Sequence, residues 1–282
     1  MNKVILIDWG MVLHIACYAS IINKAVPPTY TACVMMLSYL RKIGVDENDT
    51  IIICVDGRNS WRKDYEKTYK ANRNEQRAKS GLDWDTLFKQ FNELLLQLDK
   101  ATDFHIIQLD RMEADDIMAV ACRYFKDREV ILATFDSDLE QMWNYPNVKI
   151  FTPKIKYKSK KGSYKIRPEN FNVDLLLAKK INKETADNLV NEILTEEDYE
   201  NRMLCVNLLT LPKFIEEPIL EQLKNLPIKG QDLQWLPFQT SIVPKLETLY
   251  TDHSKVIKYE DVVKYQEKKA LRKKKKKESK RR

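Results

Sequence analysis

The sequence predicts an α/β protein with a mostly parallel central sheet flanked by helices, and three observations support this fold class. Short runs rich in β-branched residues alternate with segments of helical periodicity, which is typical of βαβ units. A chain of 282 residues, 44% of them hydrophobic, is long enough to bury a sizeable core. Its apolar runs all fall short of the roughly 18–20 residues that a membrane helix needs.

The N-terminal part of the chain supplies five predicted strands. They cover residues 4–7, 51–55, 105–109, 130–134 and 148–151. The spacing of apolar residues predicts helices over residues 29–43, 85–99 and 113–125. Because crossovers between parallel strands are right-handed by default, we expect these helices to cover both faces of the sheet.

The remainder of the chain lacks strand-like runs after a basic hairpin or loop at residues 154–167. Residues 171–225 are typical of several short helices, residues 226–250 are irregular, and residues 256–270 favour a helix that leads into a lysine-rich tail. We therefore expect three regions. Residues 1–170 form the main domain, residues 171–225 form a helical region, and residues 226–282 form an irregular segment with a basic tail.

The formal charge of +7 conceals a strong asymmetry. Residues 264–282 carry +10, residues 154–167 carry +7 and residues 58–79 carry +5, so the rest of the chain is near −15. Separate basic segments attached to an acidic body are typical of proteins that contact a polyanion. A solvated charged helix, or a solubilising or localising tail that is disordered when free, is the alternative for these segments.

Cysteine and histidine content argues against disulfides and against a zinc site. The five cysteines are odd in number, far apart and set among apolar residues, so we expect free, buried thiols in a reducing compartment such as the cytoplasm. Only three histidines occur, and none has zinc-ligand spacing with a cysteine. The N-terminal apolar run is too short for a signal peptide.

Acidic residues follow four of the predicted strands. They are Asp8 after the first, Asp56 after the second, Glu113, Asp115 and Asp116 at the helix after the third, and Asp136 and Asp138 after the fourth. In an open parallel sheet ligands bind beyond the carboxyl ends of the strands, and these residues should gather there. Taken singly, each could be a turn residue or a helix cap.

Gathered carboxylates need counter-charge. Two unit charges about 4 Å apart repel by about 4 kcal/mol at an effective dielectric of about 20. Either most of these side chains point away from one another, or divalent cations bind among them. An oxygen-only ligand set favours Mg²⁺, with Mn²⁺ as a substitute, and a pair of such ions is suited to phosphodiester hydrolysis.

Four acidic segments occur in a recognisable order with a basic segment between the second and third. They are Leu6-Ile7-Asp8, Val55-Asp56-Gly57, Glu113-Ala114-Asp115-Asp116 and Phe135-Asp136-Ser137-Asp138, with Trp61-Arg62-Lys63 and Tyr69-Lys70-Ala71-Asn72-Arg73 between. On these motifs the chain resembles the 5′-nuclease (flap endonuclease) superfamily, particularly its T-even bacteriophage branch. The resemblance covers residues 3–155 well and residues 171–222 loosely.

The resemblance implies a role for each matching residue. Asp8, Asp56, Glu113, Asp115 and Asp136 would hold a first metal ion. Asp116 and Asp138 would hold or orient a second one. The resemblance also implies a helical arch at about residues 58–80, from which Lys70 and Arg73 would contact the scissile phosphate, and a C-terminal helical region that is reduced at residues 171–225. The path of the 5′ single strand would be lined by basic residues, namely Arg58, Arg62, Lys63, Lys67, Arg77 and Lys79. Trp61, Tyr65 and Tyr69 would be available to stack on bases.

The sequence departs from the family where a Gly-Asp-x-x-Asp-Asn element normally opens a duplex-binding helix–hairpin–helix. The nearest match contains Glu184, Asp187 and Asn188, and about 40 following residues are missing. Asp187 is a candidate ligand of the second metal, with a plain helix surface as the alternative. We expect contacts to nucleic acid from the basic loop, through Lys156, Lys158, Lys160 and Lys161, and from the tail at residues 264–282 to replace the hairpin.

The resemblance implies a monomeric Mg²⁺-dependent 5′→3′ exonuclease of ribonuclease H type, acting on DNA and RNA·DNA duplexes with 5′ ends or flaps. It also implies primer removal during lagging-strand replication, with a single-strand-binding protein and a sliding clamp as partners, in the cytoplasm of a host cell and without membrane contact. Two alternatives remain open: a PIN-type single-strand ribonuclease, which would lack the arch, and a non-catalytic nucleic-acid-binding accessory with a decayed site.

Overall fold

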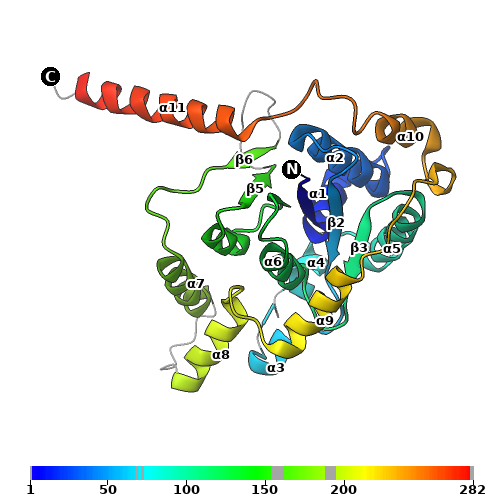
Figure 1. The fold of residues 1–282 in the computed structure, drawn as a ribbon. Coiled ribbons are helices and arrows are strands. Elements are labelled where there is room, and N and C mark those ends of the chain that lie inside the picture. Colours follow the sequence, from blue (N-terminus) through cyan, green and yellow to red (C-terminus); the bar gives the residue numbers. More distant parts are fainter. Residues whose placement is uncertain (1, 68, 71–72, 154–161, 188–194, 280–282) are drawn as a thin grey trace.

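The computed structural model describes residues 2–67, 69–70, 73–153, 162–187 and 195–279, and it has a six-stranded sheet at its centre (Figure 1). The strands are β1 (Val4–Asp8), β2 (Thr50–Val55), β3 (His105–Gln108), β4 (Val130–Ala133), β5 (Val148–Thr152) and β6 (Ser163–Lys165). Their order across the sheet is β3-β2-β1-β4-β5-β6. The first five are parallel and β6 is antiparallel to β5, which confirms the predicted α/β class and the predicted strands.

Helices surround this sheet in the manner expected of βαβ connections. In chain order they are α1 (Trp9–Ile22), α2 (Pro28–Ile43), α3 (Arg62–Tyr65), α4 (Arg73–Lys79), α5 (Trp84–Ala101), α6 (Ala114–Tyr124), α7 (Val173–Asp187), α8 (Glu196–Val206), α9 (Lys213–Lys224), α10 (Gln239–Glu247) and α11 (Tyr259–Ser279). Two 3₁₀ helices, η1 (Asp138–Asn144) and η2 (Leu233–Trp235), complete the list. None of the helices in these described ranges has an apolar stretch long enough to cross a membrane.

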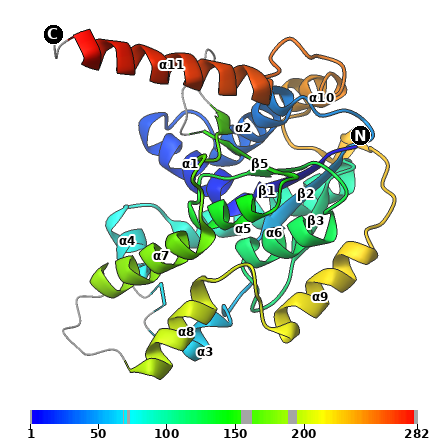
Figure 2. The ribbon, with the colours of Figure 1, turned by 60° about the vertical axis from the view of Figure 1, so that its left-hand side comes forward.

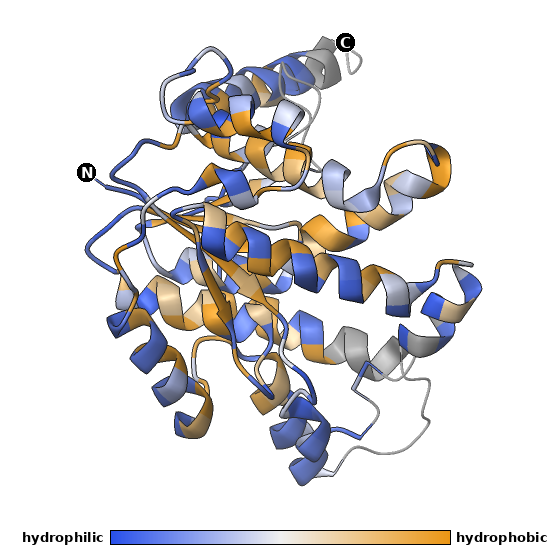
Figure 3. Cartoon of the chain, turned by 90° about the vertical axis from the view of Figure 1, so that its right-hand side faces the viewer, coloured by the Kyte–Doolittle hydropathy of each residue, from blue (hydrophilic) through white to orange (hydrophobic). Residues whose placement is uncertain are grey.

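The core has two parts because successive residues of a strand point to opposite faces of the sheet. Ile5 and Ile7 of β1 pack on the face covered by α1, α2 and α5. Val4 and Leu6 pack on the opposite face, where α6 and α9 lie. Figure 3 shows the same division, with apolar strands inside and polar residues on the outer sides of the helices.

Helix α1 was not predicted from the sequence. Its sequence, Trp9 to Ile22, has hardly any polar residues to mark an outer face, so no amphipathic period is visible. The helix begins where Asp8 caps it: the backbone N–H of Met11 donates to Asp8 Oδ1 at 3.0 Å. The residue that ends the first strand is thus held in place by the helix that follows.

Residues 226–258, which we call the strap, return to cover α2 and α5 (Figure 1). Arg41 of α2 donates to Asp252 at 2.8 Å and to the Lys245 carbonyl at 2.8 Å. The hydroxyl of Tyr250 donates to Asp103 at 2.7 Å. These contacts give a fixed course to a segment that the sequence shows only as irregular.

The C-terminal tail is helical as far as Ser279, whereas the alternative given for it was a disordered appendage. Helix α11 continues to Ser279, well beyond the predicted end at residue 270. Lysine and arginine have high helix propensity, and the first turn of α11 is packed against the body of the protein, which provides a nucleus for the rest.

The five cysteines are all free and buried, as predicted.

Gly57 marks a close approach between the segment after β2 and the segment after β3. Its N–H donates to the Met112 carbonyl at 2.7 Å, and a Cβ at this position would lie 1.9 Å from the Leu109 carbonyl oxygen. The backbone there cannot move without disturbing both connections.

We therefore expect Gly57→Ala to lower the free energy of unfolding by about 3 kcal/mol or more, measured by urea denaturation. Gly230→Ala is the matched control, because a Cβ there meets no atom within 4 Å. Equal unfolding midpoints for the two variants would contradict this account of the fold.

Candidate active site

Four carboxylates meet at the carboxyl edge of the sheet. Asp8 ends β1, Asp56 follows β2 and Asp136 follows β4, and these three strands are neighbours. Asp115 lies in the first turn of α6, in the connection after β3. The place of each strand end in a parallel sheet therefore brings together residues that are 128 positions apart in the sequence, from Asp8 to Asp136.

Their proximity is visible in their electrostatics. Burial, together with the charges of Asp56 and Asp136, raises the pKa of Asp8 to about 6. Burial, with the charges of Asp136 and Asp8, raises the pKa of Asp115 well above its usual value. A Cβ on Gly10 would lie 3.3 Å from Asp8 Oδ1 and 3.9 Å from Asp56 Oδ2, so both carboxylates lie beside the first turn of α1.

Some of these carboxylates are oriented by hydrogen bonds. The hydroxyl of Thr134 donates to Asp8 Oδ2 at 2.9 Å, and the Ala114 N–H donates to Asp56 Oδ1 at 2.9 Å. By contrast, no described residue donates a hydrogen bond or forms an ion pair to the carboxylate of Asp115. The charge of Asp115 is therefore opposed by its acidic neighbours, and the charge of Lys70 offsets this opposition only in part.

This donor set fits a divalent cation such as Mg²⁺. It contains only carboxylate oxygens, and its members raise one another's pKa, as expected where a positive charge is needed. In the described part of the chain, no three of these groups already converge as a closed ligand set. Mutual repulsion favours such separation, and Asp8 and Asp56 each accept a hydrogen bond from a neighbouring donor.

Glu113 is buried and is surrounded by groups of the arch rather than by other acids. Lys70 Nζ donates to its Oε1 at 2.6 Å, and the Tyr69 hydroxyl donates to its Oε2 at 2.8 Å. Arg62 Nη1 lies 3.1 Å from the same Oε2. Despite burial, Lys70 and Arg62 lower the pKa of Glu113. Its expected role as a ligand of the first metal stays a prediction.

Arg62 is buried in an ion pair with Asp116, which contradicts its predicted place along the path of a single strand. Arg62 is only 2% exposed and donates to both oxygens of Asp116, at 2.6 and 3.0 Å. Burial by itself disfavours the guanidinium charge, but Asp116 outweighs it and raises the pKa of Arg62. At that burial Arg62 does not line the path of a single strand. Asp116 Oδ2 also accepts from the Glu113 N–H at 2.9 Å, and the expected role of Asp116 in holding or orienting a second metal ion stays a prediction.

Trp61 is also fully buried, which contradicts its predicted role in base stacking. Its indole N–H donates to Asp116 Oδ2 at 3.0 Å. Arg62 Nε donates to the Cys205 carbonyl at 2.7 Å, and Arg202 of α8 pairs with Glu66 at 3.4 Å. The start of the arch is thus attached to the sheet edge and to α8 by a buried polar network.

The arch residues Lys70 and Arg73 lie on the same side as the carboxylates. Lys70 has a positive φ of 56°, a conformation that is sparsely populated by residues with a Cβ and is often found at functional sites. Arg73 begins α4, and Arg77 lies one turn later in the same helix. Among the other predicted basic residues, Arg58, Lys63, Lys67 and Lys79 are exposed. Tyr65 is 38% exposed, and Tyr69 is hydrogen-bonded to Glu113.

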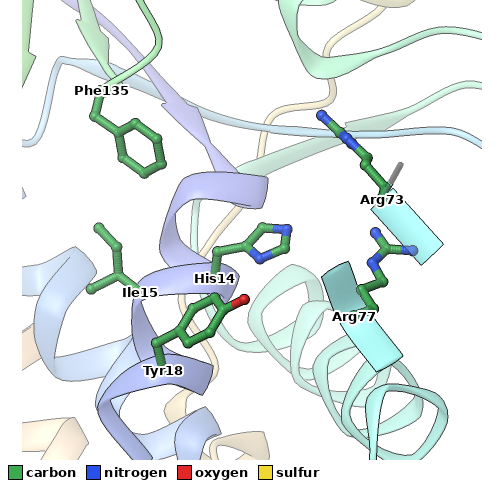
Figure 4. Close-up of a pocket in the computed structure, with 6 residues that line it drawn as sticks. All are labelled: His14, Ile15, Tyr18, Arg73, Arg77 and Phe135. Atoms are coloured by element: carbon green, nitrogen blue, oxygen red, sulfur yellow. The ribbon is translucent and has the colours of Figure 1, made fainter. Parts of the chain in front are cut away.

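A cavity of about 510 Å³ lies between α4 and α1, lined by His14, Ile15, Tyr18, Arg73, Arg77 and Phe135 (Figure 4). Burial, with the charges of Arg77 and Arg73, lowers the pKa of His14. Arg77 also lies 5.7 Å from the ring centre of Trp84 and 4.9 Å from that of Phe88. Aromatic faces beside two guanidinium groups are suited to a nucleotide.

The cavity adds residues that sequence reasoning missed. His14 and Tyr18 are four residues apart, so they share one face of α1, and Phe135 directly precedes Asp136. Their relation to the carboxylates could be recognised only once α1 was known to follow Asp8 without a break. The imidazole of His14 lines this cavity, and the charge of Asp56 also acts on its pKa.

Among the remaining predicted site residues, only Asp138 has described side-chain contacts; the side chains of the others lie outside the described residues. Asp138 forms an ion pair with Lys180 of α7, and its N–H donates to Asp136 Oδ1 at 2.8 Å. Asp187 is the last residue of α7, but the side chains of Asp187 and Glu184 lie outside the described set. Lys156, Lys158, Lys160 and Lys161 also lie outside the described residues.

Comparison with known proteins identifies relatives of this chain. The family described as "5′-3′ exonuclease, N-terminal resolvase-like domain" matches residues 3–198. Ribonuclease H of Enterobacteria phage T4 is 33% identical over 122 residues, which are 41% of this chain and 40% of that protein. The chain is thus aligned with about two fifths of the length of this curated relative.

Solved structures show the same fold. The T5 D15 protein co-crystallised with metal ions has 14% sequence identity and a TM-score of 0.50, and the match covers 80% of this chain and 99% of that one. The T5 5′-exonuclease with bound zinc has 15% identity and a TM-score of 0.50, over 80% of this chain and 100% of that one. At these identities the similarity concerns the fold.

The buried network predicts a large cost for removing Arg62. Arg62→Gln would leave Asp116 buried without its counter-ion and should lower the free energy of unfolding by about 3–5 kcal/mol, measured with urea. Arg111→Gln is the control, because Arg111 pairs with Asp64 at the surface and should contribute about 1 kcal/mol or less. Similar losses for both variants would show that the network does not stabilise the fold.

The repulsion on Asp115 predicts that Asp115→Asn is more stable than the wild type when no metal ion is bound. A carboxyl whose pKa is raised by folding weakens the folded state at every pH above that pKa. In EDTA at pH 7.5, Asp115→Asn should therefore raise the melting temperature, by about 2–4 °C per kcal/mol of relieved repulsion.

Addition of Mg²⁺ should stabilise the wild type more than Asp115→Asn, because the variant lacks one of the carboxylates that would hold the ion. Both effects can be measured by scanning fluorimetry, with the exposed Asp127→Asn as control. A lower melting temperature in EDTA, or an undiminished response to Mg²⁺, would count against the assigned site.

Proposed function

The chain belongs to the 5′-3′ exonuclease family, and from this premise we propose that it is a metal-dependent nuclease that hydrolyses phosphodiester bonds from 5′ ends. One observation carries the proposal: Asp8, Asp56, Asp115 and Asp136 interact at one edge of the sheet, next to the cationic arch. Carboxylates to hold cations and cations to hold phosphate are the two parts that such hydrolysis needs.

We propose that Asp8, Asp56, Asp115 and Asp136 hold Mg²⁺, with Glu113 as a further ligand once Lys70 turns to the substrate. Asp138 and Asp187 remain candidates for a second ion. When bound, such ions act as Lewis acids on the phosphate and lower the pKa of a water molecule. Mn²⁺ would serve as a substitute, because it also prefers oxygen ligands.

The chain's own cations bind and orient the nucleic acid. Lys70 Nζ, now 2.6 Å from Glu113 Oε1, is placed to exchange that carboxylate for a phosphate oxygen. Arg73 and Arg77 present guanidinium groups to the cavity, where a second phosphate or a terminal nucleotide would lie. The aromatic side chains of Tyr18 and Phe135 and the imidazole of His14 would limit access of water around the base.

The proposed substrates are DNA and RNA·DNA duplexes with 5′ ends, including flaps, with exposed Arg58, Lys63 and Lys67 guiding the single strand. The ribonuclease H of phage T4 gives support for RNA·DNA hybrids, since it is similar to this chain over part of its length. A role in removing primers at the lagging strand, with a single-strand-binding protein and a sliding clamp as partners, follows as a further proposal. We infer that the enzyme acts as a monomer.

The decisive test is cleavage of 5′-labelled nicked, gapped and flapped duplexes and of an RNA·DNA hybrid in Mg²⁺. Asp136→Asn should lose more than about 100-fold in rate, because even outer-shell partners of metal ligands cost about 10–100-fold. Binding to the same duplexes in EDTA should be preserved. Asp127→Asn, an exposed change on the surface, should cleave normally.

Other results would contradict the metal assignment or favour another function. Near-normal cleavage by Asp136→Asn would remove the metal assignment. Cleavage of free RNA in preference to the hybrid would favour a single-strand ribonuclease. Binding without cleavage by the wild type would favour a replication accessory, in which ion pairs such as Lys70–Glu113 have replaced metal ions.

A further inference from the structure

Helix α11 is the strongest charged feature outside the candidate active site. Its exposed cations are Lys264, Lys268, Lys269, Arg272, Lys273, Lys274 and Lys275. None of them forms an ion pair with another described residue. Figure 2 shows the helix running over the top of the molecule, with its end on the side where α4 and α7 also lie in that view. Seven exposed cations on one helix make a strongly positive surface that would attract a polyanion.

The helix begins at a fixed point on the body of the protein. Val262 is fully buried, and the ring of Tyr259 packs against Tyr164 of β6 with 5.5 Å between ring centres. Lys149 of β5 lies 5.0 Å from the same ring, and the Ile257 N–H donates to the Lys42 carbonyl at 2.8 Å. The cations of α11 therefore project in a direction that the sheet edge and the strap determine.

The chemistry of α11 favours a duplex over two other polyanionic partners. Single-stranded nucleic acid is bound by stacking as well as by charge, and α11 contains no aromatic residue after Tyr265. Insertion into an anionic membrane requires an apolar helix face, but between residues 266 and 275 only Ala270 and Leu271 are apolar. What remains is a solvated cationic rod, which suits the phosphates of a duplex.

The preceding helices of the C-terminal part do not offer an alternative cationic surface. Helix α8 carries four acidic residues and one arginine, and that arginine pairs with Glu66. Helix α9 contains three glutamates and two lysines. Among the described helices that follow the sheet, positive charge is concentrated in α11.

From these observations we propose that α11 is a binding surface for the phosphate backbone of double-stranded nucleic acid, independent of sequence. The inference rests on the proposed function only in taking nucleic acid as the ligand. The part of α11 that carries these cations, Lys264–Lys275, spans about 18 Å at 1.5 Å per residue, which corresponds to about five base pairs at 3.4 Å each. Contacts of this kind release counterions and give a steep dependence of affinity on salt.

The test compares two full-length variants that each lose four positive charges. The first carries Lys268→Gln, Lys269→Gln, Arg272→Gln and Lys273→Gln in α11. The second carries Lys89→Gln, Lys126→Gln, Lys213→Gln and Lys224→Gln at exposed sites on other helices or loops. Glutamine preserves helix propensity, so both variants should fold. Circular dichroism and thermal melting verify this.

Affinity for a blunt 24-base-pair DNA duplex is measured by fluorescence anisotropy in EDTA over 50–200 mM salt. The slope of log affinity against log salt should become shallower by about 3–4 for the α11 variant, at about 0.9 per phosphate contact. Over that salt range the wild type should then lose about 100-fold more affinity than the α11 variant. The second variant should keep most of the wild-type slope.

Three results would overturn the proposal. An unchanged slope for the α11 variant would show that the helix does not contact the duplex. Equal changes in both variants would assign the effect to net charge alone. A loss confined to a 24-nucleotide single strand, or to anionic phosphatidylserine vesicles, would assign the surface to another partner. Because binding is measured without metal, failure of the cleavage assay would leave each of these results interpretable.

Discussion

Repulsion among carboxylates at the carboxyl edge of the sheet is the constraint on which the rest of the site depends. A parallel sheet forces the ends of β1, β2 and β4 to one place, and each end delivers an aspartate there. Backbone N–H groups, Thr134 and the start of α1 hold some of these charges without neutralising them. The arch and α7 supply cations at the margin of the cluster, at Glu113 and Asp138.

Two kinds of charge compensation are therefore present, and they have different functions. Arg62 and Asp116 are buried together and tie the arch to the sheet and to α8. Lys70 and Glu113 form a pair at the partly exposed rim, where Lys70 can exchange one anion for another. A buried pair of the first kind fixes position, because separating it would leave a charge without water or a partner. A rim pair of the second kind can open when a phosphate approaches.

The sequence predicted the sheet and the edge because their signals are local. Runs of Val and Ile followed by Asp identify a strand and its carboxyl end without knowledge of the partners. It could not predict that Trp61 and Arg62 turn inward, since a Trp-Arg pair in a basic segment is equally consistent with an exposed surface. That difference depends on Cys205 and Asp116, which are distant in sequence. The cavity around His14 was missed for a related reason: α1 has no polar periodicity from which its faces could be assigned.

The strap has a consequence for how the chain folds during synthesis. Arg41 meets Asp252 across 211 positions, and Leu246 and Leu249 belong to the same core cluster as Leu37 and Leu40 of α2. At about 5–20 residues per second, the ribosome needs roughly ten seconds or more to travel from α2 to the end of the strap. During that interval one side of α2 remains uncovered although the sheet beneath it can already form. Chaperone binding to the nascent chain should therefore concentrate on this side of α2 until the strap arrives.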